Sequence, residues 1–132
     1  MSYLLDTNVC IYLIKHQPPQ VKTRFEQVPI GEIGISSITL AELRYGAAKS
    51  QAPSRNQQAL QQFTSVLAVH ALDDAAAVVY GHIRASLEQK GTPIGPLDTL
   101  IAAHALSMGM VLVTNNLKEF ERVPGLLLEN WV

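Results

Sequence analysis

Short apolar runs alternate along the chain with longer segments in which hydrophobic residues recur at helical spacing. The short runs predict β-strands at residues 3–5, 33–35, 68–72, 111–113 and 126–128, the last of them an edge strand. The periodic segments predict helices between Thr7 and Pro18 and at residues 20–28, 39–49, 55–67, 73–89 and 97–107. This alternation predicts one α/β domain over residues 1–132, with a central, mostly parallel sheet of four to five strands and right-handed crossovers.

Capping residues and helix breakers set the expected helix boundaries. Thr7 and Ser54 are residue types that cap helix N-termini, and Pro96 is suited to the first position of a helix. Gly91 follows a cationic helix end and is expected to terminate that helix. The segment 91–96 holds two glycines and two prolines, so we expect it to be a loop.

Composition narrows the class of protein. The 132 residues carry 10 Lys and Arg against 11 Asp and Glu, and 48% of them are hydrophobic, which excludes a disordered chain. The single cysteine, Cys10, excludes a disulfide framework or a cysteine-based zinc site. No apolar run reaches the roughly 18 residues of a membrane span, and no signal-peptide pattern opens the chain. We therefore expect a cytoplasmic domain, and its net charge of −1 argues against a simple polycationic sleeve for nucleic acid.

Four acidic residues fall where the predicted sheet would place its functional edge. Asp6 follows the first strand, and Glu42 lies in the helix after the second. Asp98 lies in the first turn of the helix before strand 111–113, and Glu119 follows that strand. Ligands of open α/β sheets bind beyond the carboxyl ends of the strands, and Mg²⁺ prefers carboxylate oxygens. The four acids therefore suggest a divalent-cation site that could act on a phosphate.

Each acid also has a purely structural interpretation. Asp6 could cap the first helix, and Asp98 could be a first-turn carboxylate favoured by the helix dipole. Glu119 could form a surface ion pair with Arg122, three residues further on. Glu42 has no cation at helical spacing among residues 38, 39, 45 and 46, so it is the hardest to explain in this way.

The acids lie within four longer motifs: Leu4–Asn8, Ser36–Leu43, Gly95–His104 and Val113–Phe120. In order and over nearly the whole length, these motifs resemble those of the PIN-domain ribonucleases. More narrowly, the chain is similar to the VapC toxins of bacterial type II toxin–antitoxin modules. The loop at 91–96 and the terminal Glu129–Trp131 fit the same pattern.

The resemblance implies a three-layer α/β/α PIN-like fold and a Mg²⁺-dependent endoribonuclease selective for single strands, with Mn²⁺ as a substitute ion. Asp6 and Asp98 match the principal metal ligands of the family. Glu42 and Glu119 match the acids that complete the pocket, often through water. A common fourth motif has Asp where this chain has Asn116, so the fourth role falls to Glu119, with Glu121 as the alternative. The residues expected to orient carboxylates or waters are Thr7, Asn8, Thr114 and Asn116.

These assignments suggest a mechanism and a set of partners. Water coordinated by the ion would attack the scissile phosphate in line, leaving 5′-phosphate and 3′-hydroxyl ends. The resemblance implies a structured RNA substrate, such as a tRNA cut in a loop, and hence inhibition of translation and growth. It also implies a homodimer and a VapB-type antitoxin whose C-terminal tail covers the acidic pocket, often with a basic residue among the carboxylates.

The sequence alone leaves other functions open. A haloacid-dehalogenase-like phosphatase needs a second Asp where Asn8 stands, and a receiver domain needs paired early acids and a late lysine. A non-catalytic RNA-binding α/β module would need no active acids at all. The histidines are too scattered to suggest a metal site, and we expect His104 to be a hydrogen-bonded packing residue.

Overall fold

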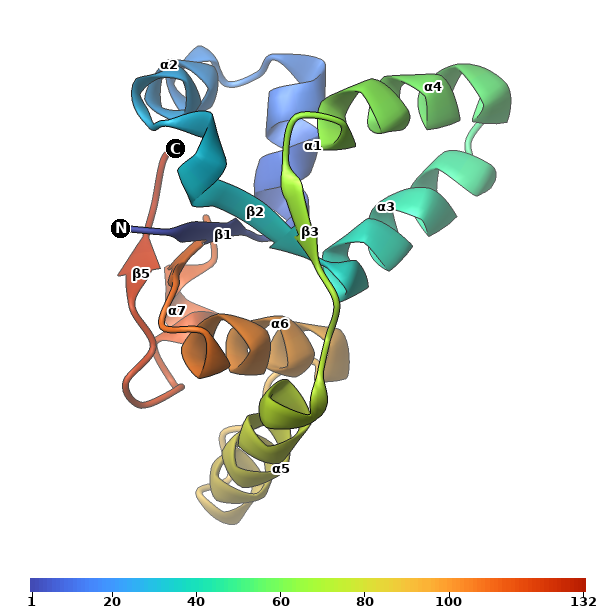
Figure 1. The fold of residues 1–132 in the computed structure, drawn as a ribbon. Helices are drawn as coiled ribbons and strands as arrows, with labels where there is room; N and C mark the ends of the chain where they lie inside the picture. The colour runs from blue at the N-terminus through green and yellow to red at the C-terminus, as the bar shows by residue number, and fades with distance from the viewer.

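Five short strands form one sheet in the order β3-β2-β1-β4-β5 in the computed structural model, which describes residues 1–132 (Figure 1). Their bounds are β1 Tyr3–Leu5, β2 Ile33–Ser36, β3 Ala68–His70, β4 Val111–Val113 and β5 Leu128–Glu129. Every neighbouring pair is parallel, so all the carboxyl ends meet at one edge. The predicted mostly parallel sheet is confirmed.

Helices cover both faces of this sheet. They are α1 Thr7–Lys15, α2 Pro19–Gln27, α3 Ser37–Ala48, α4 Pro53–Thr64, α5 Asp74–Gln89, α6 Pro96–Ser107 and α7 Leu117–Phe120, with a 3₁₀ turn at Ile30–Glu32. Figure 1 shows α1 and α2 above the sheet and α5 and α6 below it, which confirms the three-layer α/β/α architecture. Helices α3 and α4 pack on each other and extend beyond the sheet; we call this pair the α3–α4 arm.

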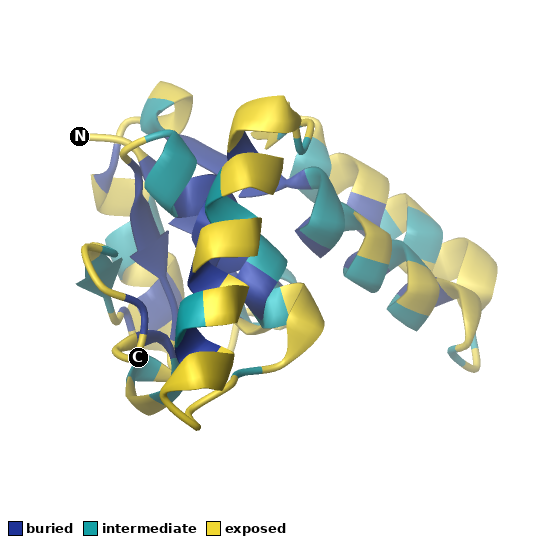
Figure 2. Ribbon diagram, turned by 90° about the horizontal axis from the view of Figure 1, so that it is seen from below, coloured by how far each residue is buried: buried dark blue, intermediate teal, exposed yellow.

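Two apolar cores follow from the alternation of side chains along the strands. Tyr3 and Leu5 of β1 face a cluster that includes residues of α1, α2, α3 and α4. Leu4, between them, faces a second cluster with α5, α6 and α7. Burial is therefore complete for the central strands, as the dark ribbon of the sheet in Figure 2 shows, while the outer helix faces are exposed.

Some predicted boundaries and caps are wrong. Thr7 is the first residue of α1 and not its cap, because the Asp6 carboxylate accepts from the backbone N–H of Val9. Ser54 caps nothing; α4 begins one residue earlier at Pro53, whose missing N–H suits that position. Gly91 does adopt the left-handed conformation expected of a helix terminator, with φ of 72°. None of the helices has both the length and the apolar character needed to cross a bilayer.

Candidate active site

Asp6 lies directly after β1 and is only 5% exposed. One carboxylate oxygen accepts from the backbone N–H of Val9 at 2.9 Å, and the hydroxyl of Thr114 hydrogen-bonds the side chain as well. Burial raises the pKa of Asp6, and the nearby Glu42 carboxylate adds to the increase, against the opposing effect of these hydrogen bonds. The capping interpretation of Asp6 is thus correct, but the capping carboxylate also lies close enough to Glu42 to be affected by its negative charge.

Glu42 reaches the same edge from α3. The Thr7 hydroxyl, at the start of α1, donates to Glu42 Oε1 at 2.6 Å. This bond joins the segment after β1 to the helix after β2, and it fixes the orientation of the Glu42 side chain. Thr7 therefore contacts an acid, as expected of a residue that orients carboxylates.

Asp98 and Glu119 form the other side of the site. Asp98 lies in the first turn of α6, and Glu119 lies in α7. The pKa of Asp98 is raised from its ordinary value of 3.8 to about 7, first by burial and then by the charge of Glu119, to which it is hydrogen-bonded. The charges of Glu42 and Asp6 raise it further. The structure therefore brings all four predicted acids together, and we call Asp6, Glu42, Asp98 and Glu119 the acid cluster.

Glu119 is held by the chain on both sides of it. One oxygen accepts from the backbone N–H of Gly95 at 3.3 Å, and the other accepts from the side-chain amide of Asn116. Gly95 is itself bound to α6, because its carbonyl accepts from the hydroxyl of Thr99 at 2.8 Å. The loop before Asp98 and the carboxylate of Glu119 thus form one hydrogen-bonded unit.

No basic side chain neutralises the acid cluster. The ion pairs of the protein join Met1 to Glu32, Arg24 to Glu129 and Arg84 to Glu88. The ion pair with Arg122, which was the structural alternative for Glu119, is absent, and Arg122 donates instead to the carbonyl of Pro93 at 3.0 Å. The cluster therefore has uncompensated negative charge, which favours a bound cation.

The remaining predicted residues divide into two groups. Thr114 hydrogen-bonds Asp6, and its hydroxyl also accepts from the backbone N–H of Asn116 at 3.0 Å. Thr114 and Asn116 therefore both belong to the hydrogen-bonded surroundings of the cluster. Asn8 is exposed, and only its backbone N–H reaches Asp6. Glu121 is exposed at the end of α7 and is not among the charges that act on Asp98, so the structure brings Glu119 rather than Glu121 to the cluster.

The donor set of the acid cluster fits Mg²⁺. Its side chains offer only carboxylate oxygens, the ligands that hard divalent cations prefer. No three acidic, histidine or cysteine side chains converge closely enough to enclose a metal ion by themselves. Mg²⁺ does not need such a cage, since it usually binds one or two carboxylates and keeps several waters.

A buried polar layer lies at this edge, and part of it was not predicted. The buried polar residues are Asp6, Ser36, Thr39, Thr99, His104 and Thr114. His104 Nδ1 lies 2.8 Å from the Ser36 hydroxyl, which confirms His104 as a hydrogen-bonded packing histidine. Sequence spacing does not predict Ser36 as its partner, because the two residues are 68 positions apart and are joined only by the packing of α6 against the end of β2 and the start of α3.

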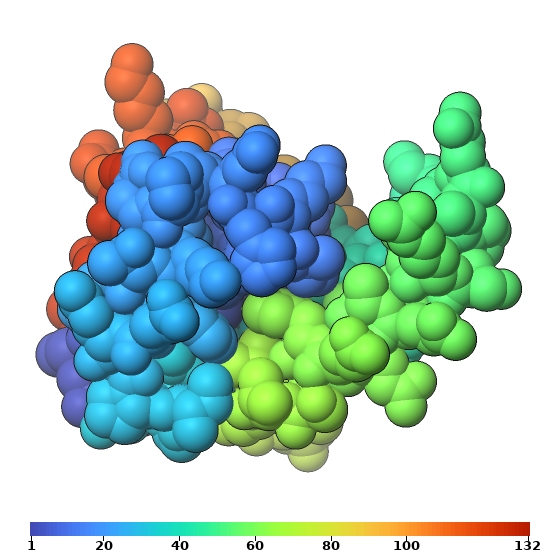
Figure 3. Space-filling model, turned by 90° about the horizontal axis from the view of Figure 1, so that it is seen from above, coloured from blue at the N-terminus to red at the C-terminus, as the bar shows by residue number.

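A groove of about 360 Å³ opens beside the acid cluster, between α1 and the α3–α4 arm. Figure 3 shows it as the hollow between the blue and green parts of the surface. Its apolar walls include Ile11, Ile14, Leu43 and Leu60, and Glu42 lies in its lining. The groove therefore leads directly to one of the four acids.

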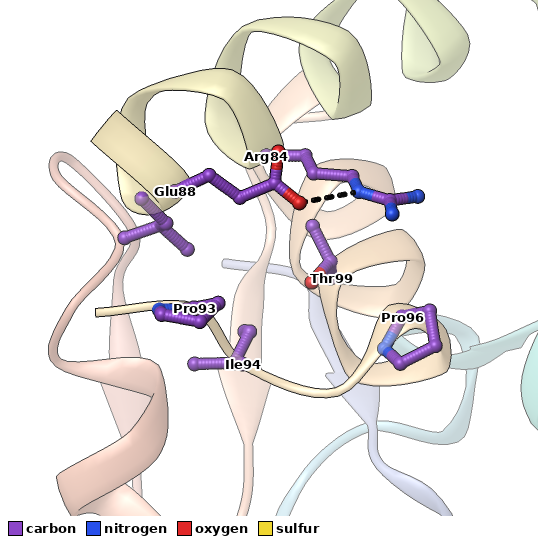
Figure 4. Close-up of a pocket in the computed structure, with 7 residues that line it drawn as sticks. Arg84, Glu88, Pro93, Ile94, Pro96 and Thr99 are labelled. Atoms are coloured by element: carbon purple, nitrogen blue, oxygen red, sulfur yellow. Dashed lines mark hydrogen bonds and ion pairs between the residues drawn. The ribbon is translucent and has the colours of Figure 1, made fainter. Parts of the chain in front are cut away.

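A smaller cavity of about 90 Å³ lies behind the loop that precedes Asp98. Figure 4 shows the Arg84–Glu88 ion pair on α5 above Pro93 and Ile94 of that loop. No acid of the cluster lines this cavity. Its walls hold the loop against α5, which makes it a packing feature rather than a second site.

Sequence matches to known proteins span nearly the whole chain. The PIN domain family matches residues 3–126. The tRNA(fMet)-specific endonuclease VapC of Salmonella typhimurium is 51% identical over 131 residues, which is 99% of this chain and 98% of that protein. Ribonuclease VapC2 of Haemophilus influenzae is 48% identical over 132 residues, with 100% and 99% of the two chains covered.

Solved structures agree with the fold. A chain in the crystal structure of DNA-bound VapBC from Salmonella typhimurium matches with a TM-score of 0.95 and 51% identity, covering 100% of this chain and 99% of that one. A chain of VapBC-1 from nontypeable Haemophilus influenzae matches with a TM-score of 0.90 and 38% identity, covering 99% and 98%.

Proposed function

The chain belongs to the PIN-domain family, as a VapC-type endonuclease toxin of a toxin–antitoxin module, and on that premise we propose that it is a Mg²⁺-dependent endoribonuclease that cleaves tRNA and thereby inhibits translation and growth. The observation that carries the proposal is the acid cluster. Four carboxylates from four segments meet at the carboxyl edge of the sheet without a basic partner. Such an arrangement is unfavourable on its own and favourable around a divalent cation.

Asp6 and Asp98 are the residues that would hold the ion, since Asp6 caps the start of α1 and Asp98 lies in the first turn of α6, and both helix starts are at this edge. Mg²⁺, when bound, would activate a water for attack on the phosphate and stabilise the charge on the departing oxygen. Glu42 and Glu119 would hold and orient water molecules, because Thr7 fixes one carboxylate and Asn116 the other. Hydrolysis by water leaves 5′-phosphate and 3′-hydroxyl ends.

The substrate proposal rests on the relatives. Two of them, from Salmonella typhimurium and Shigella flexneri, are named tRNA(fMet)-specific endonucleases, at 51% and 50% identity. We therefore propose an initiator-type tRNA, cut in an unpaired loop whose backbone can enter the acid cluster. Loss of initiator tRNA would stop translation, which accounts for the growth arrest that we expect.

The test is to sequence RNA 5′ ends after brief expression of the chain in growing cells. We expect new 5′-phosphate ends at one site in a tRNA, absent from cells that express Asp6→Ala or Asp98→Ala. Glu121→Gln is the matched control, since Glu121 is an exposed acid outside the cluster, and it should cleave like the wild type. Purified protein should require Mg²⁺ or Mn²⁺ and lose cleavage in EDTA. Products with 2′,3′-cyclic phosphate ends that persist in EDTA would overturn the mechanism.

We also propose a VapB-type antitoxin as the physiological partner, in a complex that contains a homodimer of this chain. The related chains were solved as VapBC complexes. The groove between α1 and the α3–α4 arm suits an apolar segment of the antitoxin tail, and a guanidinium at the end of that segment would reach Glu42 and the other carboxylates. Ala59→Glu, at a partly exposed residue in the groove lining outside the core, should prevent co-purification of the antitoxin encoded beside this chain while leaving RNA cleavage in place. Unchanged co-purification would refute this docking site.

A further inference from the structure

A buried hydrogen bond joins α6 to the start of α3 behind the acid cluster. His104 Nδ1 and Ser36 Oγ are 2.8 Å apart, and the two residues are 1% and 0% exposed. His104 is on the same helix as Asp98, and Ser36 is the N-cap of the helix that carries Glu42. The bond therefore connects the supports of two acids that are distant in sequence.

The contact can form with either tautomer of the neutral ring. Ser36 Oγ accepts from the backbone N–H of Ile38 at 3.1 Å. Its hydroxyl can donate to His104 Nδ1, and its second lone pair can accept from Nδ1–H. Burial, followed by the neighbouring His70, lowers the pKa of His104, which favours the neutral ring.

Neighbouring groups fix the orientation of the ring. His70 packs edge-on to His104, with ring centroids 6.4 Å apart and an interplanar angle of 83°. His70 in turn lies over Gly34, where a Cβ atom would come within 2.7 Å of His70 Nε2. Glycine at position 34 thus makes room for His70, and His70 limits the movement of His104.

A histidine is a costly choice if this position only fills space. His104 Nε2 is buried without any hydrogen-bond partner, and an unpaired buried polar atom destabilises the folded state. An apolar side chain of similar size would fill the site without this cost. The bond to Ser36 is what the imidazole adds, and its geometric effect is to fix α6 relative to α3.

We propose that His104 is a positioning residue: its bond to Ser36 sets the separation between Asp98 and Glu42 and thereby the affinity of the acid cluster for a divalent cation. The inference rests on the proposed function, because it concerns the same site. Mg²⁺ requires near-ideal octahedral geometry, so a small sliding of α6 along α3 weakens binding even when all four carboxylates remain. Ser36 and His104 are 0% and 1% exposed, so the proposed role needs no contact of either residue with the ion or the RNA.

Two substitutions at His104 separate the hydrogen bond from the volume. His104→Asn places an amide where Nδ1 stands and can still bond Ser36, but it is smaller than histidine. His104→Gln is closer in volume, but it places its amide where Nε2 stands. If the volume of the side chain determines the affinity for the ion, His104→Gln should retain more of that affinity than His104→Asn. If the hydrogen bond to Ser36 determines it, His104→Asn should retain more.

The measurement is Mn²⁺ affinity of the full-length protein by calorimetry or electron paramagnetic resonance, without RNA. We expect His104→Gln to bind Mn²⁺ about tenfold more weakly, and His104→Asn to stay within about threefold of the wild type. In RNA cleavage at saturating Mg²⁺, the KM for RNA should not change in either variant. Equal Mn²⁺ affinity in wild type and both variants, or weaker binding by asparagine than by glutamine, would overturn the proposal.

A second pair keeps the test decisive if a His104 variant unfolds. Ser36→Ala removes the partner of His104 together with the cap on the Ile38 N–H, whereas Ser36→Thr retains a hydroxyl for both, so only the alanine variant should bind Mn²⁺ about tenfold more weakly. Equal affinity in this pair also overturns the positioning role. Failure of the wild type itself to bind Mn²⁺ would overturn the metal site of the proposed function, and the positioning role with it, which distinguishes the two failures.

Discussion

Replacing Asp98 by asparagine removes one negative charge from the acid cluster while keeping the shape of the side chain. Burial and three neighbouring carboxylates raise the pKa of Asp98 from 3.8 to about 7, so the folded chain disfavours its ionised form. The amide of asparagine can donate to Glu119, where two carboxylates otherwise compete for one proton. We therefore expect Asp98→Asn to be more stable than the wild type in the absence of divalent cations, although it should be inactive.

The size of this stabilisation follows from the shift in the pKa of Asp98. A change in pKa from 3.8 to about 7 corresponds to at most about 4 kcal/mol of unfolding free energy at pH 7.5. Asp98 is partly exposed, and water and salt screen its interactions, so we expect about 1–2 kcal/mol. For a domain of this size that is an increase in Tm of about 3–8 °C.

The pH dependence of stability is a separate test of whether Asp98→Asn stabilises the fold. Because folding raises the pKa of Asp98, its contribution favours the folded wild type below about pH 4 and is lost as the pH rises toward about 7. The advantage of Asp98→Asn should therefore be larger at pH 7.5 than at pH 5. Addition of Mg²⁺ at pH 7.5 should raise the Tm of the wild type and leave that of the variant unchanged.

Thermal unfolding in EDTA, with and without excess Mg²⁺, measures all of these quantities. Glu121→Gln is the matched control, since it removes an exposed acid and should change the Tm by less than about 2 °C. The reasoning is refuted if Asp98→Asn is less stable than the wild type at pH 7.5 in EDTA, or if its advantage is the same at pH 5.

Further predictions concern the residues around the cluster. Thr7→Val removes the bond to Glu42 and should lower kcat about tenfold with little change in KM for RNA, whereas Thr7→Ser should restore it; equal kcat values for the two variants would show that the bond does not orient Glu42. Gly34→Ala should destabilise the chain by about 1–3 kcal/mol, because the added Cβ meets His70 Nε2 at 2.7 Å and the Ala68 carbonyl at 2.9 Å. Gly81→Ala, inside α5 with nothing within 4 Å, should instead stabilise it by up to about 1 kcal/mol. Urea unfolding checks both glycine variants, and a stabilising Gly34→Ala would contradict the packing of His70.

The sequence was sufficient to predict the sheet and the four acids because both depend on local patterns. Val111–Val113 is a short β-branched run after a helix terminator, and it forms β4 with those bounds. Asp6 and Glu119 follow strands, and the parallel direction of those strands brings them to one edge. Because the strands are parallel, the segments that follow them and the start of the helix before β4 lie at the same edge of the sheet. The four acids can therefore be placed together without knowledge of contacts between distant segments.

Contacts between distant segments could not be predicted in the same way. The spacing of Glu119 and Arg122 allows an ion pair on a helix, but α7 is short, and Arg122 lies beyond its end and donates to Pro93. The partner of His104 depends on how α6 packs on β2, which no spacing rule describes. The wrong cap at Ser54 has a local cause, because Pro53 starts the helix first.

The charge distribution links the acid cluster to RNA binding. The whole chain has a net charge of −1, but its ten basic residues face only seven acids outside the cluster, so the body carries +3. RNA phosphates are attracted to such a body and repelled by four uncompensated carboxylates at its centre. A divalent cation lowers the charge of the four carboxylates from −4 to −2, which reduces that repulsion, and it brings the total charge of the chain from −1 to +1. In the proposed function, the ion therefore does more than supply chemistry: it also determines whether a phosphate can approach the acids, so RNA and the ion should bind cooperatively.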